Sequence, residues 1–320
     1  NLERIETIKN WLKNQLNQEF IMKAASSDAS FRRYFRIIIG KKTYILMDAP
    51  PNLEKIKNFI NITKKLAFYK INVPKIISFS DELGLVLMSD FGSQTFLDAI
   101  DNKNMSELYA NAINSLLNIQ EKVDIKRIKK YSETLLIKEM SLFPEWYLTK
   151  LKNNNLINQD DLNEIFLLIS KKSLSQNTCF VHRDFHSRNL MLVSDKKLGI
   201  LDYQDALCGP LSYDLVSLLK DAYIKWDEEF VIDQSVHYWE KARKIGLIKN
   251  QDFSEFYKNF EWIGVQRHLK ILGIFSRLSI RDKKDQYLKD IPLVEKYLLD
   301  TSERYKDLYP LRKILDKVIS

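Results

Sequence analysis

The chain has 320 residues, 45% of them hydrophobic and 12% aromatic, so it can bury a large core and is long enough for two domains. No run of 18 apolar residues occurs, which excludes an ordinary membrane span, and the acid-containing amphipathic start fits neither a secretory signal nor a transit peptide. A net charge of +8 without a nucleic-acid-binding motif indicates a solvated, Lys-rich exterior rather than a nucleic-acid surface. Two isolated cysteines and four histidines form no zinc pattern and indicate buried thiols in a reducing cytoplasm.

The first part of the chain predicts a helix followed by a small antiparallel sheet. Apolar residues recur at helical spacing from Leu2 to Leu16. Strands are predicted over residues 31–39, 43–48, 73–79 and 83–88. The turn-rich segment 26–30 before the first strand can lay backbone N–H groups over phosphates, which makes Ser27 and Asp28 candidate nucleotide contacts.

Helical patterns dominate the remainder of the chain. The main helices are predicted over residues 52–69, 95–100, 106–120, 133–151 and 263–280. The predicted elements thus form a small sheet-containing part followed by a mainly helical part.

The stretch from Phe180 to Asp202 contains the most specific chemical pattern. It reads FVHRDFHSRNLMLVSDKKLGILD, a polar loop followed by two short apolar strands around a turn. Asp184 and Asn189 lie in the loop, and the hairpin returns Asp202 to its mouth. Phosphoryl transfer needs a carboxylate that orients and deprotonates the attacking hydroxyl, and an amide and a carboxylate that hold Mg²⁺ on the phosphates. We predict Asp184 as the base and Asn189 and Asp202 as metal ligands; the alternative is an ordinary polar loop.

The pattern H-x-D-x-x-x-x-N from His182 to Asn189, with Asp202 after the hairpin, resembles the catalytic and metal-binding segments of eukaryotic-like kinases. Tyr203-Gln204-Asp205 stands where protein kinases have Phe-Gly, and this departure indicates the small-molecule kinases of the aminoglycoside phosphotransferase superfamily. Over nearly its whole length the chain is similar to the bacterial sugar kinases of this superfamily, which phosphorylate N-acetylmuramate and N-acetylglucosamine at the anomeric hydroxyl in cell-wall recycling. The similar segments are DASFRRYFR at 28–36, LMDAPP at 46–51, LVLMSDFG at 85–92, LFPEWYL at 142–148, ILDYQDALCGPLSYDLVSLLKDAY at 200–223 and QRHLKILGIFSRLSIRD at 266–282.

The resemblance implies an α+β, protein-kinase-like fold with two lobes. Residues 1–89 would form a small antiparallel-sheet lobe that binds the nucleotide, and residues 90–320 a large, mainly helical lobe with the catalytic loop and the acceptor site. ATP and Mg²⁺ would bind between the lobes. In the hinge, residues 89–92, Ser89 and Phe91 would contact adenine.

The nucleotide site departs from the family pattern in one respect. Kinases usually carry a Lys near the end of the third strand to neutralise the phosphates, where this chain has Leu46-Met47-Asp48. Another cation must then do this work, and Arg33 and Arg36 on the preceding strand are the candidates; the alternative for each is a solvated strand face. Glu54 corresponds to the helix carboxylate of kinases, but its place in the first turn of the predicted helix favours a helix-dipole role.

On the acceptor side, the helix predicted over 133–151 puts Glu139, Phe143 and Trp146 on one face. Trp146 can pack against a sugar ring and Glu139 can accept its hydroxyls; alternatively, both aromatic rings are core and Glu139 is solvated. Arg267 belongs to a basic stripe that can bind an acidic group of the substrate or the transferred phosphate, or else faces water.

Three further residues of the catalytic segment have supporting roles in this interpretation. The resemblance implies that Asp214 braces the catalytic loop by accepting backbone or Arg donors; the alternative is a charge at a helix N-terminus. His182 and His186 are predicted to be structural, because the base is supplied by Asp184.

The sequence therefore predicts a cytoplasmic, ATP- and Mg²⁺-dependent kinase of an amino sugar, with no obligate protein partner. A kinase of another hydroxyl acceptor, such as an aminoglycoside, a choline-like amine or an amino alcohol, would have the same loop, although a basic stripe disfavours polycations. A non-catalytic nucleotide-binding module is the third alternative, which the missing strand Lys suggests and the retention of Asp184, Asn189 and Asp202 opposes.

Overall fold

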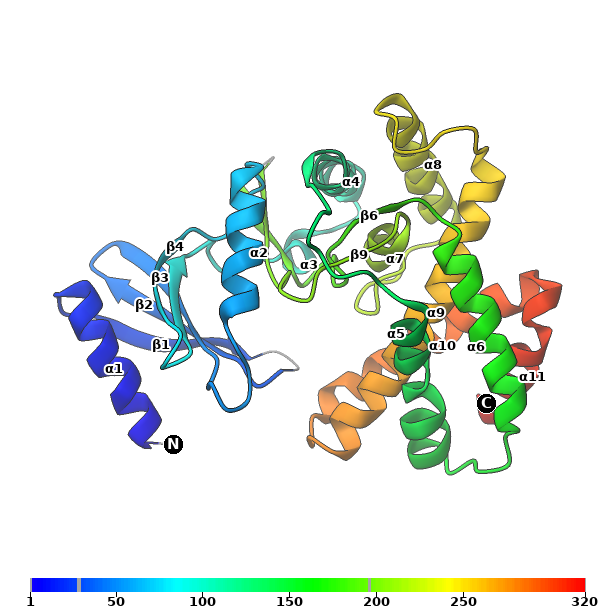
Figure 1. Cartoon of the computed structure of the whole chain (residues 1–320), viewed down its shortest axis with the longest axis horizontal. Helices are drawn as coiled ribbons and strands as arrows, with labels where there is room; N and C mark the ends of the chain where they lie inside the picture. The colour runs from blue at the N-terminus through cyan, green and yellow to red at the C-terminus, as the bar shows by residue number, and fades with distance from the viewer. Residues whose placement is uncertain (1, 28–29, 195–196, 320) are drawn as a thin grey trace. The chain divides into compact units, whose positions relative to one another are not determined.

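The structure, a computed structural model, describes residues 2–27, 30–194 and 197–319. It divides the chain into two compact units, Asn1–Gln94 with Met191–Asp205, and Thr95–Leu190 with Ala206–Ser320 (Figure 1). The sequence predicts a single boundary after residue 89, whereas here the hairpin segment after the catalytic loop belongs to the first unit. Hydrogen bonds explain this, because the Ile200 N–H donates to the Asn72 carbonyl at 2.9 Å and the Asn72 amide donates to the Leu198 carbonyl at 2.9 Å.

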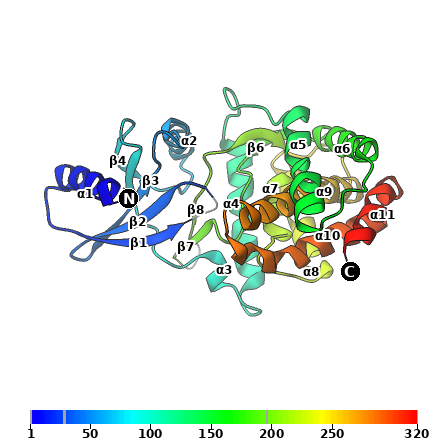
Figure 2. The ribbon, with the colours of Figure 1, turned by 90° about the horizontal axis from the view of Figure 1, so that it is seen from below.

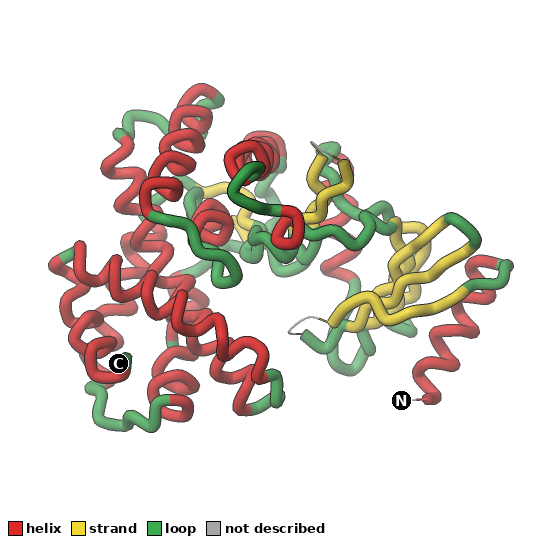
Figure 3. Tube along the Cα trace, turned by 180° about the vertical axis from the view of Figure 1, so that it is seen from behind, coloured by secondary structure: helices red, strands yellow, loops and turns green. Residues whose placement is uncertain are grey.

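The first unit contains a five-stranded antiparallel sheet of order β1-β2-β3-β5-β4, drawn in yellow in Figure 3. Its strands are β1 (Ile21–Ser27), β2 (Arg33–Ile39), β3 (Lys42–Asp48), β4 (Ile76–Ser80) and β5 (Leu85–Ser89). The other elements are the helices α1 (Leu2–Leu16) and α2 (Lys57–Phe68) and the hairpin of β7 (Leu190–Ser194) and β8 (Lys197–Ile200). The apolar stripe of α1 packs on the sheet, since Ile8 and Leu12 share a core with Ile37 and Leu46.

Two predictions for this unit are wrong in detail. Residues 26 and 27 belong to β1, which the sequence does not predict, because its Ala- and Ser-containing segment has low strand propensity and forms an edge strand only by pairing with β2. The helix predicted from residue 52 begins at Lys57, because the segment before it turns, with the Leu53 N–H donating to the Pro50 carbonyl at 2.9 Å. Glu54 therefore lies outside the helix.

The second unit is mainly helical. Its helices are α3 (Phe96–Ala99), α4 (Met105–Lys122), α5 (Glu133–Met140), η1 (Phe143–Leu151), α6 (Gln159–Leu174), α7 (Tyr213–Leu219), α8 (Glu228–Lys244), α9 (Phe253–Ile280), η2 (Asp285–Asp290), α10 (Ile291–Arg304), η3 (Lys306–Leu308) and α11 (Tyr309–Val318). The short strands β6 (Thr178–Val181) and β9 (Leu207–Pro210) pair antiparallel. Among the described residues, no helix has the length and apolarity needed to cross a membrane.

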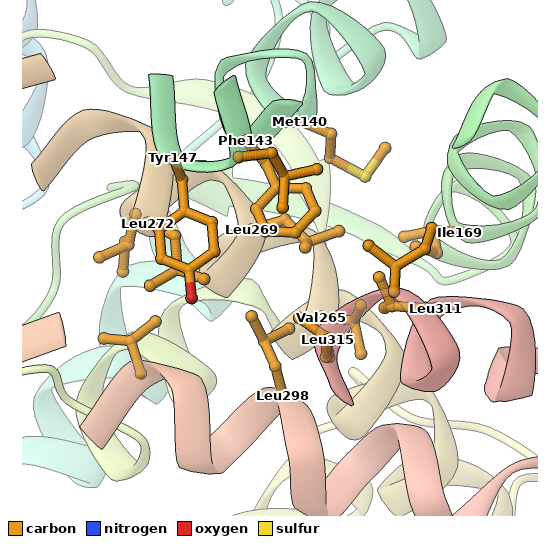
Figure 4. Packing of buried hydrophobic residues seen from close by; sticks show 14 of the residues in the cluster. Met140, Phe143, Tyr147, Ile169, Val265, Leu269, Leu272, Leu298, Leu311 and Leu315 are labelled. Carbon is orange, nitrogen blue, oxygen red and sulfur yellow. The ribbon is translucent and has the colours of Figure 1, made fainter. Parts of the chain in front are cut away.

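Helix α9 is the centre of this unit. It has 28 residues and packs against η1, α6, α7 and α10 (Figure 2). Most of its side chains are buried, which is expected for a helix that is covered on nearly all sides. Leu269 and Leu272 of α9 meet Phe143 of η1 and Leu298 of α10 in the main core (Figure 4).

The helix predicted over 133–151 is not one α-helix. The α-helix ends at Met140, and Phe143–Leu151 form a π-helix, in which the Lys152 N–H donates to the Tyr147 carbonyl at 2.9 Å. Pro144, which lacks an N–H donor, lies at its start and prevents the regular α-helical bond there. Because the helical period changes after α5, Glu139 does not share one helical face with Phe143 and Trp146, contrary to the prediction from the sequence. Phe143 is in the core, and Trp146 is half-buried beneath the Lys150 ammonium, 3.6 Å from the ring centroid.

Candidate active site

The loop of residues 182–189 between β6 and β7 is held at its start by Asp214. This buried carboxylate, in the first turn of α7, accepts the backbone N–H groups of His182 at 2.7 Å and Arg183 at 3.0 Å. Burial raises the pKa of Asp214 above its ordinary value, although the two backbone donors and the nearby His182 oppose this. The predicted bracing role of Asp214 is confirmed.

A second buried carboxylate holds the far end of the loop. Asp221, which is 1% exposed, accepts hydrogen bonds from the Ser187 hydroxyl and from the Ser187 N–H, the latter at 2.9 Å. Its other oxygen accepts the Tyr223 N–H at 2.9 Å. Sequence reasoning missed Asp221, yet a signal exists. It follows Asp214 by seven residues, the spacing of two helical turns, in the mainly apolar segment DLVSLLKD.

Hydrogen bonds inside the loop fix the backbone of Asp184. Its N–H donates to Nδ1 of His182 at 3.0 Å, and its carbonyl accepts the His186 N–H and the Asn189 side-chain amide, both at 2.9 Å. His182 is 1% exposed, and its ring nitrogen serves this turn. These contacts support the structural role predicted for His182.

The Asp184 carboxylate itself lies next to a buried guanidinium. Nη1 of Arg267 is 3.6 Å from Oδ1 of Asp184 and donates to the Arg183 carbonyl at 2.6 Å. Burial raises the pKa of Asp184, but the charges of Arg267 and Lys270 lower it by more, so the net pKa lies well below that of an ordinary aspartate. With 39% of its side chain exposed, Asp184 is an ionised carboxylate that solvent can reach. Arg267 and Lys270 of the predicted basic stripe are thus buried next to this loop instead of facing water.

Glu139 lies in a buried charge network beneath the same loop. Its carboxylate accepts hydrogen bonds from the Tyr131 hydroxyl and the Arg183 guanidinium and pairs with Lys270 at 3.0 Å. Burial raises the pKa of Glu139, and Lys270 and Arg183 lower it by more, leaving it below the ordinary value. The alternative that Glu139 is solvated is wrong. The network supports Arg183, whose φ of 83° is a left-handed conformation unusual for a side-chain-bearing residue.

The predicted metal ligands have the donor chemistry that Mg²⁺ prefers. The Asn189 amide nitrogen donates to the Asp184 carbonyl, which turns the amide oxygen to the opposite side of the group. Oδ1 of Asp202 accepts hydrogen bonds from Nη2 of Arg32 at 3.2 Å and from Nε2 of Gln204 at 2.5 Å. Within the described ranges no group of three or more His, Cys, Asp or Glu side chains could hold a metal. Taken separately, the Asn189 amide oxygen and the Asp202 carboxylate are each a donor of the kind that Mg²⁺ accepts, and Mg²⁺ usually keeps waters and phosphate oxygens as further ligands.

In the first unit, the two arginines predicted as phosphate-binding cations each pair with a carboxylate. Arg33 donates to Asp48, at 3.0 Å from Nε and 2.5 Å from Nη2. Arg36 donates to Asp90 at 2.7 Å and to the Gly92 carbonyl at 3.1 Å. The structure thus shows Arg36 anchoring the predicted hinge to the sheet.

The other predicted nucleotide contacts lie at the ends of strands. Ser27 ends β1 and Ser89 ends β5, while Asp28 lies outside the described residues. Half-buried Phe91 covers Gly199 of β8, where a Cβ atom would meet the ring of Phe91 at 2.5 Å. Only glycine fits under this ring.

Sequence reasoning also misplaced Glu54. Because it precedes α2, it is not a helix-dipole residue; Oε1 of Glu54 instead pairs with Nη1 of Arg32 at 3.4 Å. The strand predicted over residues 31–39 includes Arg32 and puts it on the same face as Arg36, whereas in the structure β2 begins at Arg33 and Arg32 precedes it.

Comparison with known proteins identifies the family of the chain. The chain belongs to the phosphotransferase enzyme family, whose family model matches residues 21–245. It is 40% identical to an N-acetylmuramate/N-acetylglucosamine kinase of Neisseria meningitidis serogroup B, over 99% of this chain and 97% of the relative. A kinase of the same name from Pseudomonas aeruginosa is 38% identical, over 98% and 96% of the two chains.

Among solved structures, an ADP-bound aminoglycoside phosphotransferase superposes with a TM-score of 0.58 at 15% identity, covering 90% of this chain and 96% of the other. At this identity the likeness concerns the fold alone. The predicted family and the kinase-like α+β fold are confirmed, and the protein is a phosphotransferase.

Proposed function

We propose that this phosphotransferase is a cytoplasmic kinase that transfers the γ-phosphoryl group of ATP to the anomeric hydroxyl of N-acetylmuramate or N-acetylglucosamine. The single observation that carries the proposal is the Asp184 carboxylate, which solvent can reach, which pairs with Arg267 and which lies on a loop that two buried aspartates brace. The names of the full-length relatives supply the acceptor class. The ADP-bound structural neighbour supports nucleotide use.

Asp184 would act by orienting the acceptor hydroxyl and taking its proton. A bond forms between the hydroxyl oxygen and the γ-phosphorus, the bond from that phosphorus to the ADP oxygen breaks, and the proton passes to the carboxylate. Because the pKa of Asp184 is held low, the residue is a weak base, suited to receive the proton late and to remain ionised near neutral pH. Arg267 stabilises that ionised state.

Asn189 and Asp202 would hold Mg²⁺, assigned by the sequence motif and by their oxygen donors. When bound, the cation would neutralise phosphate charge as the phosphoryl group moves. The chain's own part is to keep both side chains oriented, by the bond from the Asn189 amide to the catalytic loop and by the bonds that Arg32 and Gln204 make to Asp202.

Arg267 is less suited to the acceptor role predicted for it. Its guanidinium is 5% exposed and already donates to the Arg183 carbonyl beside Asp184, and Lys270 pairs with Glu139. We therefore propose a positioning role for Arg267 and leave the choice between the two amino sugars to experiment. A kinase of another hydroxyl acceptor is the second candidate, because the same fold occurs in an aminoglycoside phosphotransferase.

Phosphorus NMR of the product tests the proposal. The protein is incubated with ATP and Mg²⁺ and, separately, with N-acetylmuramate, N-acetylglucosamine and an aminoglycoside. We expect a sugar 1-phosphate, in which the phosphorus couples to the anomeric proton. A phosphate ester at another hydroxyl, or product only with the aminoglycoside, would contradict the proposed acceptor. ATP binding without transfer to any acceptor in a wide screen would favour the non-catalytic alternative.

A further inference from the structure

The place where kinases usually carry their phosphate-binding Lys holds an acid in this chain. Asp48 at the end of β3 is 0% exposed and accepts hydrogen bonds from two arginines, Arg4 at 2.7 Å and Arg33 at 2.5 Å. Arg33 donates to this buried carboxylate from both Nε and Nη2, so turning toward a phosphate would cost it two charge-assisted hydrogen bonds. The cation that meets the nucleotide must come from elsewhere.

Arg32 has the required surroundings. It is 5% exposed, and its guanidinium reaches three segments of the first unit: Nε donates to the Ser30 hydroxyl at 3.0 Å, Nη1 pairs with Glu54 at 3.4 Å, and Nη2 pairs with Asp202 at 3.2 Å. The last contact places a fixed positive charge on the carboxylate predicted to bind Mg²⁺. The Asp202 side chain is 25% exposed, so this end of the cluster opens to solvent, whereas Arg32 itself is enclosed.

We propose that Arg32 is the phosphate-binding cation of the nucleotide site and that Glu54 is its positioning carboxylate. This inference rests on the proposed kinase function. Arg32 and Glu54 form an ion pair next to Asp202, the aspartate proposed to bind Mg²⁺. A strand Lys and a helix Glu provide the same arrangement of charges in protein kinases. Here both members come from segments outside regular elements, before β2 and before α2.

The contact with Asp202 suggests how the cluster responds to Mg²⁺ and nucleotide. Oδ1 of Asp202, which Arg32 contacts, is an oxygen of the kind that Mg²⁺ binds. With a cation bound to Asp202, Arg32 would no longer be needed to neutralise this carboxylate, and one of its nitrogens could turn toward a phosphate oxygen while Glu54 and Ser30 keep its direction. A guanidinium suits this exchange because its planar fork can bind a carboxylate and a phosphate at once, which an ammonium on a flexible stem does less well.

The test compares nucleotides that differ in phosphate number. Isothermal titration calorimetry in the presence of Mg²⁺ gives the affinities of ATP, ADP and adenosine for the full chain and for Arg32→Gln, Arg32→Lys and Glu54→Gln. The matched control is Arg4→Gln, which also removes from the first unit one positive charge that pairs with a buried carboxylate. We expect Arg32→Gln to weaken ATP and ADP about 10- to 100-fold, the range of a charge-assisted hydrogen bond, and to leave adenosine within about twofold. Arg32→Lys should recover part of the loss, and Glu54→Gln should lose less than Arg32→Gln.

The control and the wild type separate the possible failures. Arg4→Gln should change the three affinities by one common factor, since Arg4 donates to Asp48 at the end of β3 and to the Leu83 carbonyl in the turn before β5. If Arg32→Gln also weakens adenosine as much as ATP, Arg32 is a structural residue and the inference is wrong while the kinase function stands. If Arg32→Gln is unfolded by circular dichroism, the same comparison is read from Arg32→Lys and Glu54→Gln, and an equal effect on adenosine and ATP in both would overturn the inference. A wild-type chain that binds none of the three ligands would overturn the proposed function as well.

Discussion

Replacing Arg267 by alanine is expected to make the reaction more sensitive to acid. Only the ionised form of Asp184 can accept a proton, so the rate falls as the pH drops below the pKa of this carboxyl. In the wild type Arg267 and Lys270 hold that pKa well below its ordinary value. Without Arg267 the effect of burial is less opposed, the pKa rises, and the acid limb of the pH–rate profile moves to higher pH.

The separation of the two charges sets the size of the shift. Unit charges 3.6 Å apart interact by about 1 kcal/mol at the dielectric constant of water and about 5 kcal/mol at an effective value of 20. The Asp184 side chain is 39% exposed, so solvent screening favours the lower part of this range, about 1 to 2.5 kcal/mol. This corresponds to a rise of about 1 to 2 pKa units.

A discontinuous assay with radiolabelled ATP can measure kcat/KM from acid to neutral pH without coupling enzymes. Arg267→Lys is the control, because it keeps the charge but loses the planar fork that also holds the Arg183 carbonyl. We expect a lower rate with an unmoved acid limb for the lysine variant, and a moved limb for the alanine variant. An acid limb that is the same in Arg267→Ala and the wild type would refute the electrostatic role assigned to Arg267.

Two other variants test the supports of the loop. Asp221→Asn should weaken the charge-assisted hydrogen bonds at the far end of the loop, destabilising the protein by about 1.5 to 3 kcal/mol and lowering kcat even where the variant is fully folded. Urea unfolding and kcat measured at 25 °C check this. An unchanged kcat would mean that the far end of the loop needs no fixed position. Glu139→Gln removes the negative charge that neutralises the buried Arg183 and Lys270, and should lower the free energy of unfolding by about 3 to 5 kcal/mol in the same measurement. A negligible change would indicate that the network is better hydrated than its burial implies.

The turns and strands around the loop of residues 182–189 are predicted well because they depend on preferences of residues that are close together in the sequence. The spacing from Asp184 to Asn189, the hairpin that follows, and Asp214 at a helix start all depend on short-range turn and strand preferences. Periodicity likewise predicts α1 and most of α9, whose apolar residues recur at helical spacing. These are the parts of the fold and the site for which local preference and tertiary structure agree.

The parts that the sequence does not predict depend on contacts between distant segments. Edge strand β1 forms by pairing with β2, and the π-helix η1 has the same residue types as an α-helix, so neither is visible in local propensity. The direction of Arg32 is set by Glu54 and Asp202, which lie 22 and 170 positions away in the chain. Arg267 was predicted to face a ligand or water, but the packing of α9 beneath the loop turns it toward Asp184.

The central claim is that Asp184 performs the transfer step, and the turnover of Asp184→Asn tests it most directly. The amide keeps the shape of the side chain but cannot take the proton of the acceptor. With N-acetylmuramate or N-acetylglucosamine as acceptor, we predict that kcat falls by about 10² to 10⁴ while the affinity for ATP, measured by calorimetry on the same preparation, stays within about twofold. Turnover equal to that of the wild type would contradict the account and remove Asp184 from the reaction.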